Sequence, residues 1–218
     1  MTKLKTLIFF VSLTWGAASS SVAEAALPPF GWSNTWLNVY IGQLSGRSGT
    51  YVCYQKNDGS NEFSIVKIGD ANGIWDATVK AGNMKDFIVV HYGGPNYNCG
   101  SFGTINGPPI NFDPVLEIYG FGGDDYIYGG NKTWIIWGGD GNDDLRSSSP
   151  GVTMYGGFGN DRIYWNGTGN AYLYGQEADD CLQADGPSSY VDGGSGTDGC
   201  SRVSGTMVNC ERAASCGD

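Results

Sequence analysis

The sequence predicts an all-β protein, a one-sided parallel β-roll (a solenoid) with an N-terminal β-rich cap and a disulfide-closed C-terminal tail. A nonapeptide pattern, G-G-x-G-x-D-x-U-x with U a large apolar residue, recurs five times in residues 114–200. Its aspartates are separated by 18, 18, 19 and 18 residues, and two nonapeptides make one full coil of a parallel β-roll. The composition, with 36 glycines, 13% aromatic and 16% charged residues, favours strands and turns.

The first 25 residues are expected to be a secretory signal peptide. Lys3 and Lys5 supply the positive start, residues 7–15 form an apolar core, and an A-x-A cleavage site ends at Ala25. The apolar core is too short for a transmembrane helix, and no later segment qualifies. We therefore expect a secreted, extracellular protein with no membrane span.

Charge and cysteine content narrow the class of protein further. A formal net charge of −10 argues against nucleic acid as a partner. An even number of cysteines behind a secretion signal predicts disulfides, although six cysteines allow 15 connectivities. We expect Cys53 to pair with Cys99 and Cys200 with Cys210, which leaves Cys181 with Cys216. A zinc site is the alternative, but the chain has no C-x-x-C and a single histidine, His91.

Residues 26–113 are less informative. Alternation and turn residues predict strands at 36–41, 50–54, 63–68, 74–80 and 87–92. Two architectures fit: a small antiparallel domain joined by Cys53 and Cys99, or irregular coils of the same solenoid, which we prefer slightly. In both cases the segment must cap the first edge of the roll. Residues 201–218 are expected to form the C-terminal cap.

The five repeats carry the chemistry. Glycines let the loops adopt positive φ and let successive backbones stack closely. Their carbonyls, together with one carboxylate per loop, make an oxygen-rich site suited to Ca²⁺. Five stacked loops leave four gaps, so we predict about four Ca²⁺ ions in one row. The predicted ligand positions are Gly120, Gly122, Asp125, Gly138, Gly139, Gly141, Asp143, Gly156, Gly157, Gly159, Asp161, Gly175, Asp180, Gly193, Gly194, Gly196 and Asp198.

These segments resemble the RTX, or haemolysin-type, calcium-binding repeat, over about 85 residues. The N-terminal signal and the six cysteines make the chain similar to small Sec-exported proteins that carry a few such repeats. No protease or lipase activity is expected from the resemblance, because in the family these activities reside in separate catalytic domains. The aspartates are therefore expected to be structural ligands, and metal binding to be linked to folding.

Departures from the pattern predict weaker sites at particular loops. Phe121 replaces a glycine of the first copy, and Gln176 and Ala178 replace two glycines of the fourth. On the opposite turns the positions equivalent to the aspartates hold no carboxylate, which makes the roll one-sided. Those positions are Trp134, Val152, Ala171 and Ser189.

Three functions are compatible with these residues. The first is a non-enzymatic calcium-binding protein acting as a structural or adhesive component of a cell surface or matrix. The second is a carbohydrate-binding module for extracellular polysaccharide, because Tyr119, Trp137, Tyr155 and Tyr174 are expected outward in one column, where they would otherwise pack on each other. The third is a hydrolase in the N-terminal half using His91 and carboxylates such as Glu62, Asp76 or Asp86, but no catalytic motif marks them. We therefore assign no catalytic residue.

Overall fold

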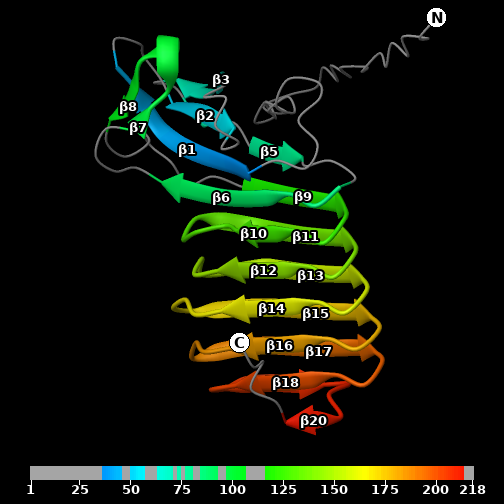
Figure 1. The fold of residues 1–218 in the computed structure, drawn as a ribbon. Coiled ribbons are helices and arrows are strands. Elements are labelled where there is room, and N and C mark those ends of the chain that lie inside the picture. Colours follow the sequence, from blue (N-terminus) through cyan, green and yellow to red (C-terminus); the bar gives the residue numbers. More distant parts are fainter. Residues whose placement is uncertain are drawn as a thin grey trace, which may run out of the picture.

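The computed structural model describes residues 36–45, 50–56, 63–70, 73–74, 77–80, 84–92, 97–106 and 116–213. These residues form an all-β solenoid of about five coils, with parallel strands stacked in two sheets (Figure 1). The predicted signal peptide, residues 1–25, lies outside the described residues. No helix in the described ranges is long and apolar enough to cross a membrane.

Each coil contributes one strand to each sheet. The first sheet is built in the order β5 (Ala77–Lys80), β9 (Leu116–Gly122), β11 (Thr133–Asp140), β13 (Thr153–Phe158), β15 (Asn170–Glu177), β17 (Ser188–Ser195) and β19 (Gly205–Val208). The second contains β6 (Phe87–Tyr92), β10 (Tyr126–Tyr128), β12 (Asp144–Ser147), β14 (Arg162–Trp165), β16 (Cys181–Ala184), β18 (Gly199–Arg202) and β20 (Arg212–Ala213). All neighbours among these strands are parallel.

The large apolar residue of each nonapeptide points into the space between the sheets, as the repeat predicts. Because side chains alternate across a strand, this places one buried residue on every short strand. All ten are at most 1% exposed: Ile118, Ile127, Ile136, Leu145, Met154, Ile163, Leu173, Leu182, Val191 and Cys200. They belong to one continuous core that also includes residues of the N-terminal strands.

The turns opposite the aspartate loops close the core without carboxylates at the inward positions. Val152, Ala171 and Ser189 are buried there, whereas Trp134, at the corresponding sequence position, is 51% exposed. A register shift between Thr133 and Ile135 turns Trp134 outward and leaves Thr133 buried in its place. The 19-residue coil places its extra residue on this edge, between β14 and β15.

The N-terminal half combines features of both expected architectures. β5 and β6 continue the two parallel sheets by one coil, with Val79 opposite Ile118 and Ile88 opposite Ile127. Beyond them, β1 (Trp36–Leu44), β2 (Thr50–Lys56), β3 (Phe63–Asp70) and β4 (Gly73–Ile74) extend the second sheet as antiparallel neighbours, with β1 parallel to β6. The single strand predicted at 74–80 is wrong, because β4 and β5 belong to different sheets.

A small second core lies beside these antiparallel strands. β7 (Tyr97–Asn98), the 3-10 turn η1 (Gly100–Phe102) and β8 (Thr104–Asn106) pack Cys99 and Ile105 against Tyr51 and Cys53. The disulfide between Cys53 and Cys99 joins them, as predicted. Cys200 and Cys210 also pair as predicted. Cys181 is disulfide-bonded, and its predicted partner, Cys216, lies outside the described residues.

Candidate metal centre

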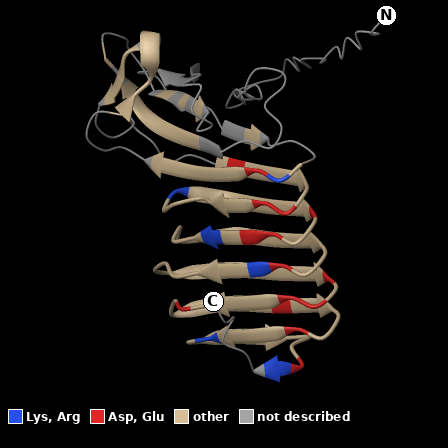
Figure 2. Cartoon of the chain, in the orientation of Figure 1, with Lys and Arg blue, Asp and Glu red and all other residues tan. Residues whose placement is uncertain are grey.

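The five repeat aspartates form a single column along one edge of the solenoid. Each directly precedes a strand of the second sheet, so the parallel register of β10, β12, β14, β16 and β18 stacks them coil upon coil. Acidic residues recur from coil to coil near this edge (Figure 2). The column residues are buried, at no more than 2% exposure: Asp125, Asp143, Asp161, Asp180 and Asp198.

One oxygen of each carboxylate is used to tie two coils together. The backbone N–H of Asp125 donates to Oδ1 of Asp143 at 2.8 Å, and the N–H of Asp143 donates to Oδ1 of Asp161 at 2.8 Å. The same bond continues from Asp161 to Asp180 and from Asp180 to Asp198, both at 2.8 Å. Each aspartate is therefore fixed by the coil before it, with its side chain held inside the loop.

The other oxygen of each carboxylate is buried without a hydrogen-bond partner. Among the described residues, the buried side-chain oxygen and nitrogen atoms that lack a partner are the Oδ2 atoms of these five aspartates alone. Leaving a buried polar group unpaired costs about 1–3 kcal/mol, and more when the group is charged. Five repetitions of such a cost at one edge point to a missing positively charged or proton-donating partner.

The orphaned oxygens pack against the first glycine of each loop. A Cβ added to Gly138 would lie closer than 3.0 Å both to Oδ2 of Asp143 and to the carbonyl oxygen of Gly156 in the next coil. The same pair of oxygens, one carboxylate and one carbonyl, flanks the other four first-position glycines: Gly120, Gly156, Gly175 and Gly193. Each first-position glycine is thus flanked by oxygens from two consecutive coils, and a methyl group there would overlap with both oxygens.

Backbone carbonyls of the other loop positions run along the stack. The carbonyl of Gly139 lies against Gly157, and that of Gly141 lies against Gly159, so closely that a Cβ would overlap with it. Second- and fourth-position glycines of the motif have positive φ, which L-residues rarely adopt. The glycines at these positions are Gly123, Gly139, Gly141, Gly157, Gly159, Gly194 and Gly196.

Three non-glycine residues adopt the same backbone conformation. Phe121, Gln176 and Ala178 have φ of 74°, 88° and 77°, and all three are exposed. The loop geometry is therefore kept where the glycine pattern is broken, with the side chains directed to solvent. In the first copy, Gly122 is opposite Asp140 at the third position of the motif, and Gly123 is the fourth-position glycine.

Burial raises the pKa of every aspartate in the column. Desolvation is the main cause, and neighbouring carboxylates add to it, while the backbone hydrogen bond to Oδ1 acts in the opposite direction. The resulting pKa is about 7 for Asp125, about 6 for Asp143, about 8 for Asp161 and about 7 for Asp180. The pKa of Asp198 is also raised. At neutral pH, ionising Asp125, Asp161 and Asp180 therefore carries a cost that a proton or a cation would remove.

The donor set fits a hard divalent cation. No group of three or more His, Cys, Asp or Glu side chains that could hold a metal occurs in the described ranges. Between two consecutive loops, the available oxygens are instead one orphaned carboxylate oxygen, the next aspartate of the column and backbone carbonyls. Calcium accepts six to eight oxygen ligands, including carbonyls, in flexible geometry, whereas zinc prefers nitrogen and sulfur ligands. The residues present therefore fit Ca²⁺ better than they fit zinc.

The column is longer than the repeats predict. The N–H of Asp86, which precedes β6, donates to Oδ1 of Asp125 at 2.6 Å, and the N–H of Asp198 donates to Oε2 of Glu211 at 2.9 Å. Asp86 could have been found from residues 81–89, which keep glycine at position two, aspartate at position six and isoleucine at position eight. Glu211 has no glycine-rich context and carries no such signal.

A second ladder of polar side chains, also missed, lies at the fifth position of the loops. Here the N–H of each coil donates to the side chain of the coil before it, with distances of 2.8–3.0 Å. The ladder is exposed and links Asp124, Asn142, Asn160, Asp179 and Thr197. The side-chain oxygens that accept these bonds have partners, so the ladder stiffens the loops without offering a comparable vacant ligand.

Most rings of the aromatic column on the first sheet stack on one another. Trp137 stacks on Tyr155 at 3.9 Å between ring centroids, and Tyr155 stacks on Tyr174 at 5.0 Å. Tyr119 instead stacks at 6.0 Å on Phe121, leaving an apolar hollow between these two rings and Trp137. Ring faces in the middle of the column are therefore covered by neighbouring rings, as expected from packing.

Among the described residues, His91 lies beside aromatic rings and a small hollow. His91 stacks on Tyr40 at 5.0 Å, and burial lowers its pKa. Among the described residues, the hollow beside it is lined without a carboxylate, by Val90, His91, Tyr97, Tyr128, Gly130, Asn131 and Ser148. Of the carboxylates weighed for a hydrolase, Asp86 belongs to the acidic column, and Glu62 and Asp76 lie outside the described residues.

Comparison of the chain with protein-family models, curated proteins and solved structures gave no match.

Proposed function

We propose that this chain is a secreted, calcium-binding β-roll protein whose folding depends on extracellular Ca²⁺ and which serves as a structural or adhesive component of a surface or matrix. The observation that carries the proposal is the row of five buried carboxylate oxygens without a partner. The roles outside the cell follow from the predicted signal peptide and from the disulfides, which are typical of oxidising compartments.

Calcium would supply the positive charge that the column lacks. In the bound state, the Oδ2 atoms of successive aspartates and the first-position carbonyls are the groups of this chain that would hold the ions. The glycine loops bring those oxygens together without side chains in the way, and the bonds to Oδ1 hold the carboxylates in place. Binding therefore connects each coil to the next along the whole edge.

The same arrangement makes the metal-free fold costly at neutral pH. Five ionised carboxylates would be desolvated and would repel one another, which is reflected in their raised pKa values. In the unfolded chain these groups are solvated, so the cost is removed by unfolding. A ligand that binds only the folded state stabilises it in proportion to the logarithm of its concentration, and millimolar Ca²⁺ is the range that weak extracellular sites use.

The proposal is tested by circular dichroism of the mature protein after chelation, titrated with Ca²⁺ or with Mg²⁺ as the control ion. We expect β-structure and melting temperature to rise with Ca²⁺ and to respond weakly to Mg²⁺, which prefers smaller, more rigid octahedral sites. Equal melting temperatures in chelator and in Ca²⁺ would contradict the proposal.

An isosteric variant makes the test specific to the column. In Asp143→Asn, the amide oxygen can still accept the bond from Asp125, while its NH₂ group replaces the orphaned oxygen beside the carbonyl of Gly156. We expect this variant to melt above the wild type in chelator and to gain less from Ca²⁺. Asp140→Asn is the matched control, because it removes the same charge from an exposed position of the same loop that lies outside the column.

A second candidate function is carbohydrate binding at the hollow formed by Tyr119, Phe121 and Trp137. It is favoured by one observation: within the described part of the chain, Tyr119 stacks on Phe121 and Trp137 on Tyr155, although strand pairing places Tyr119 beside Trp137. Glycan-array binding that disappears in Trp137→Ala but persists in Tyr174→Ala would support it. Absence of binding to any glycan would remove it.

A further inference from the structure

We propose that the row ends in a fifth calcium site at the C-terminal cap, between Asp198 and residues 209–211, which the four gaps between the five repeats do not include. This inference rests on the proposed function. It differs from it in that Asn209 and Glu211 belong to no repeat.

The first observation is the state of Asp198. Its side chain is completely buried, and its Oδ2 has no hydrogen-bond partner. If ions were held only between the repeat loops, Asp198 would use Oδ1, the oxygen that faces the preceding coil, and no ion would lie beside its Oδ2. Its Oδ1 already accepts the bond from the N–H of Asp180, as in every other rung. The orphaned Oδ2 is therefore left facing the cap.

The second observation is which groups surround this oxygen. A Cβ added to Gly193 would lie closer than 3.0 Å both to Oδ2 of Asp198 and to the carbonyl oxygen of Asn209. In the preceding coil, Gly175 is flanked in the same way by Oδ2 of Asp180 and the carbonyl oxygen of Gly193. The carbonyl of Asn209 thus takes the place of a first-position glycine carbonyl, and the cap reproduces the oxygen pair of the repeats.

The third observation is the position of Glu211. It directly precedes β20, whose first residue is paired with Gly199, just as Asp198 directly precedes β18. Its Oε2 accepts the N–H of Asp198 at 2.9 Å, which is the bond that every repeat aspartate accepts from the coil before it. Glu211 is therefore the next rung of the column, with a longer side chain that compensates for the shorter loop before it.

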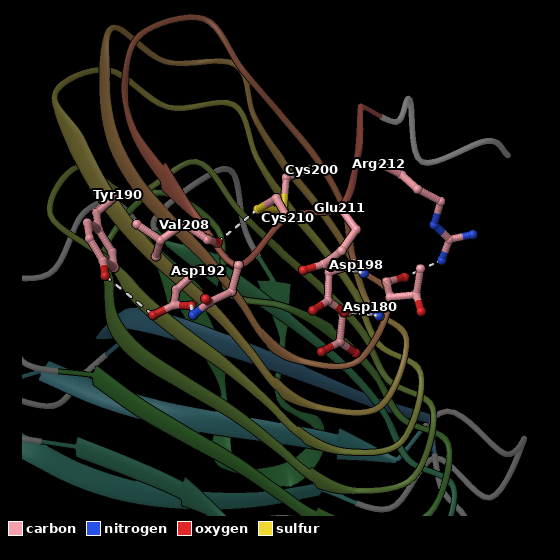
Figure 3. Close-up of a disulfide and its surroundings, with 11 residues drawn as sticks. Asp180, Tyr190, Asp192, Asp198, Cys200, Val208, Cys210, Glu211 and Arg212 are labelled. Carbon is pink, nitrogen blue, oxygen red and sulfur yellow. Dashed lines mark hydrogen bonds between the residues drawn. A yellow bond between two sulfur atoms is a disulfide. The ribbon is translucent and has the colours of Figure 1, made fainter.

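The Cys200–Cys210 disulfide holds the two halves of this site together. Cys200 lies two residues after Asp198, and Cys210 directly precedes Glu211 (Figure 3). The side chain of Asn209 also donates a hydrogen bond to Asp192 at 2.8 Å, and its backbone has a φ of 49°. These contacts fix the exposed cap against the last loop, where no further coil of the described chain would position it.

The N-terminal end of the column differs. Asp86 donates its N–H to Asp125, but its carboxylate is not among the orphaned groups. The sequence position equivalent to the first glycine is Ala81, which lies outside the described residues and carries the Cβ that the glycines lack. We therefore place the additional ion at the C-terminal end only.

The test is the number of bound calcium ions per chain, measured by equilibrium dialysis and elemental analysis of the intact mature protein. In Glu211→Gln, the amide oxygen can still accept the bond from Asp198, so only the charge is removed. We expect this variant to bind one ion fewer than the wild type. Glu177→Gln is the matched control, since Glu177 is exposed and outside the column, and it should bind the wild-type number.

A second variant reaches the same site from the other side. Gly193→Ala would force a methyl group against Oδ2 of Asp198 and the carbonyl of Asn209, so it too should bind fewer ions than the wild type. If both variants bind as many ions as the wild type, the fifth site is refuted while the proposed function stands. Loss of every ion from Glu211→Gln would also refute it, because Glu211 would then act as a cap for the whole row. A wild-type protein that binds no calcium would refute the proposed function itself.

Discussion

In the absence of Ca²⁺, we expect the solenoid to lose stability as the pH rises from about 4 to about 8, the interval between the ordinary aspartate pKa of 3.8 and the folded-state pKa of Asp161. Because burial raises the folded-state pKa values, the protonated aspartates stabilise the fold, and this contribution is complete below the aspartate pKa of the unfolded chain. It is lost as the pH rises through the folded-state values, where the fold must release protons that it holds more tightly than the unfolded chain does.

The magnitude follows from the individual aspartates. For Asp125, the difference between 3.8 and a folded pKa of about 7 corresponds to about 4 kcal/mol. Whole domains are stable by about 5–15 kcal/mol, so ionising several such groups removes most of the stability. Between 3.8 and its own folded-state pKa, each aspartate lowers the free energy of unfolding by about 1.4 kcal/mol per pH unit. In a domain of this size, that lowers the melting temperature by roughly 3–6 °C per pH unit.

Saturating Ca²⁺ should reverse the sign of this dependence. Under the proposed function, calcium would bind the ionised carboxylates in competition with protons, so the stability should rise with pH over the same interval. The assay is thermal melting by circular dichroism across the pH range, once in chelator and once in Ca²⁺. The two curves of melting temperature should have opposite slopes. Parallel slopes would refute the reasoning, because the aspartates would then not be the groups that link metal, proton and fold.

Three further predictions concern single features of the fold. Gly156→Ala would place a methyl group against Oδ2 of Asp161, and Gly156 does not have a positive φ that alanine would disfavour, so the number of bound calcium ions should fall. Gly151→Asn, in an open turn, should leave that number unchanged. Trp165→Ala should lower the free energy of unfolding in Ca²⁺ by about 3–5 kcal/mol, measured by denaturant titration, because its ring is fully buried, yet the number of bound ions should stay constant. Replacing Cys53 and Cys99 together by serine should cost about 2–5 kcal/mol and leave calcium binding unchanged, because their small core is separate from the column; altered stoichiometry would contradict this separation.

The sequence carried most of the information about the roll because its geometry is repeated. A period of nine residues fixes which side chain points inward, so residues such as Ile127 and Leu182 could be placed in the core without a structure. The column of aspartates followed from the same period. Regular coils allow such inference because each one repeats the environment of its neighbour.

The parts that could not be predicted are those where the period fails. Thr133 replaces Trp134 in the interior because of a local register shift that no residue pattern marks. The separation of β4 from β5 depends on which sheet each one joins, which is a long-range property. Strand pairing and a disulfide position Glu211 in the column, although the residues around it do not resemble a repeat.

The different roles of the two oxygens of each carboxylate could also not be predicted from the sequence. A motif can indicate that Asp143 faces the loop, but it cannot show that Oδ1 is used by the backbone of Asp125 while Oδ2 is left without a partner. Which oxygen accepts the backbone bond depends on the spacing between one coil and the next. It is the reason that the structure adds support for a cation beyond the resemblance of the repeats.

The most direct test is a crystal structure of the mature protein grown in Ca²⁺, with anomalous diffraction used to locate the ions. We predict a row of peaks along the aspartate edge, each within about 2.3–2.6 Å of an Oδ2 atom, as expected for calcium–oxygen distances. A column without peaks, in which each Oδ2 lies at hydrogen-bonding distance from a carbonyl of the next coil, would show protonated aspartates instead and would contradict the account.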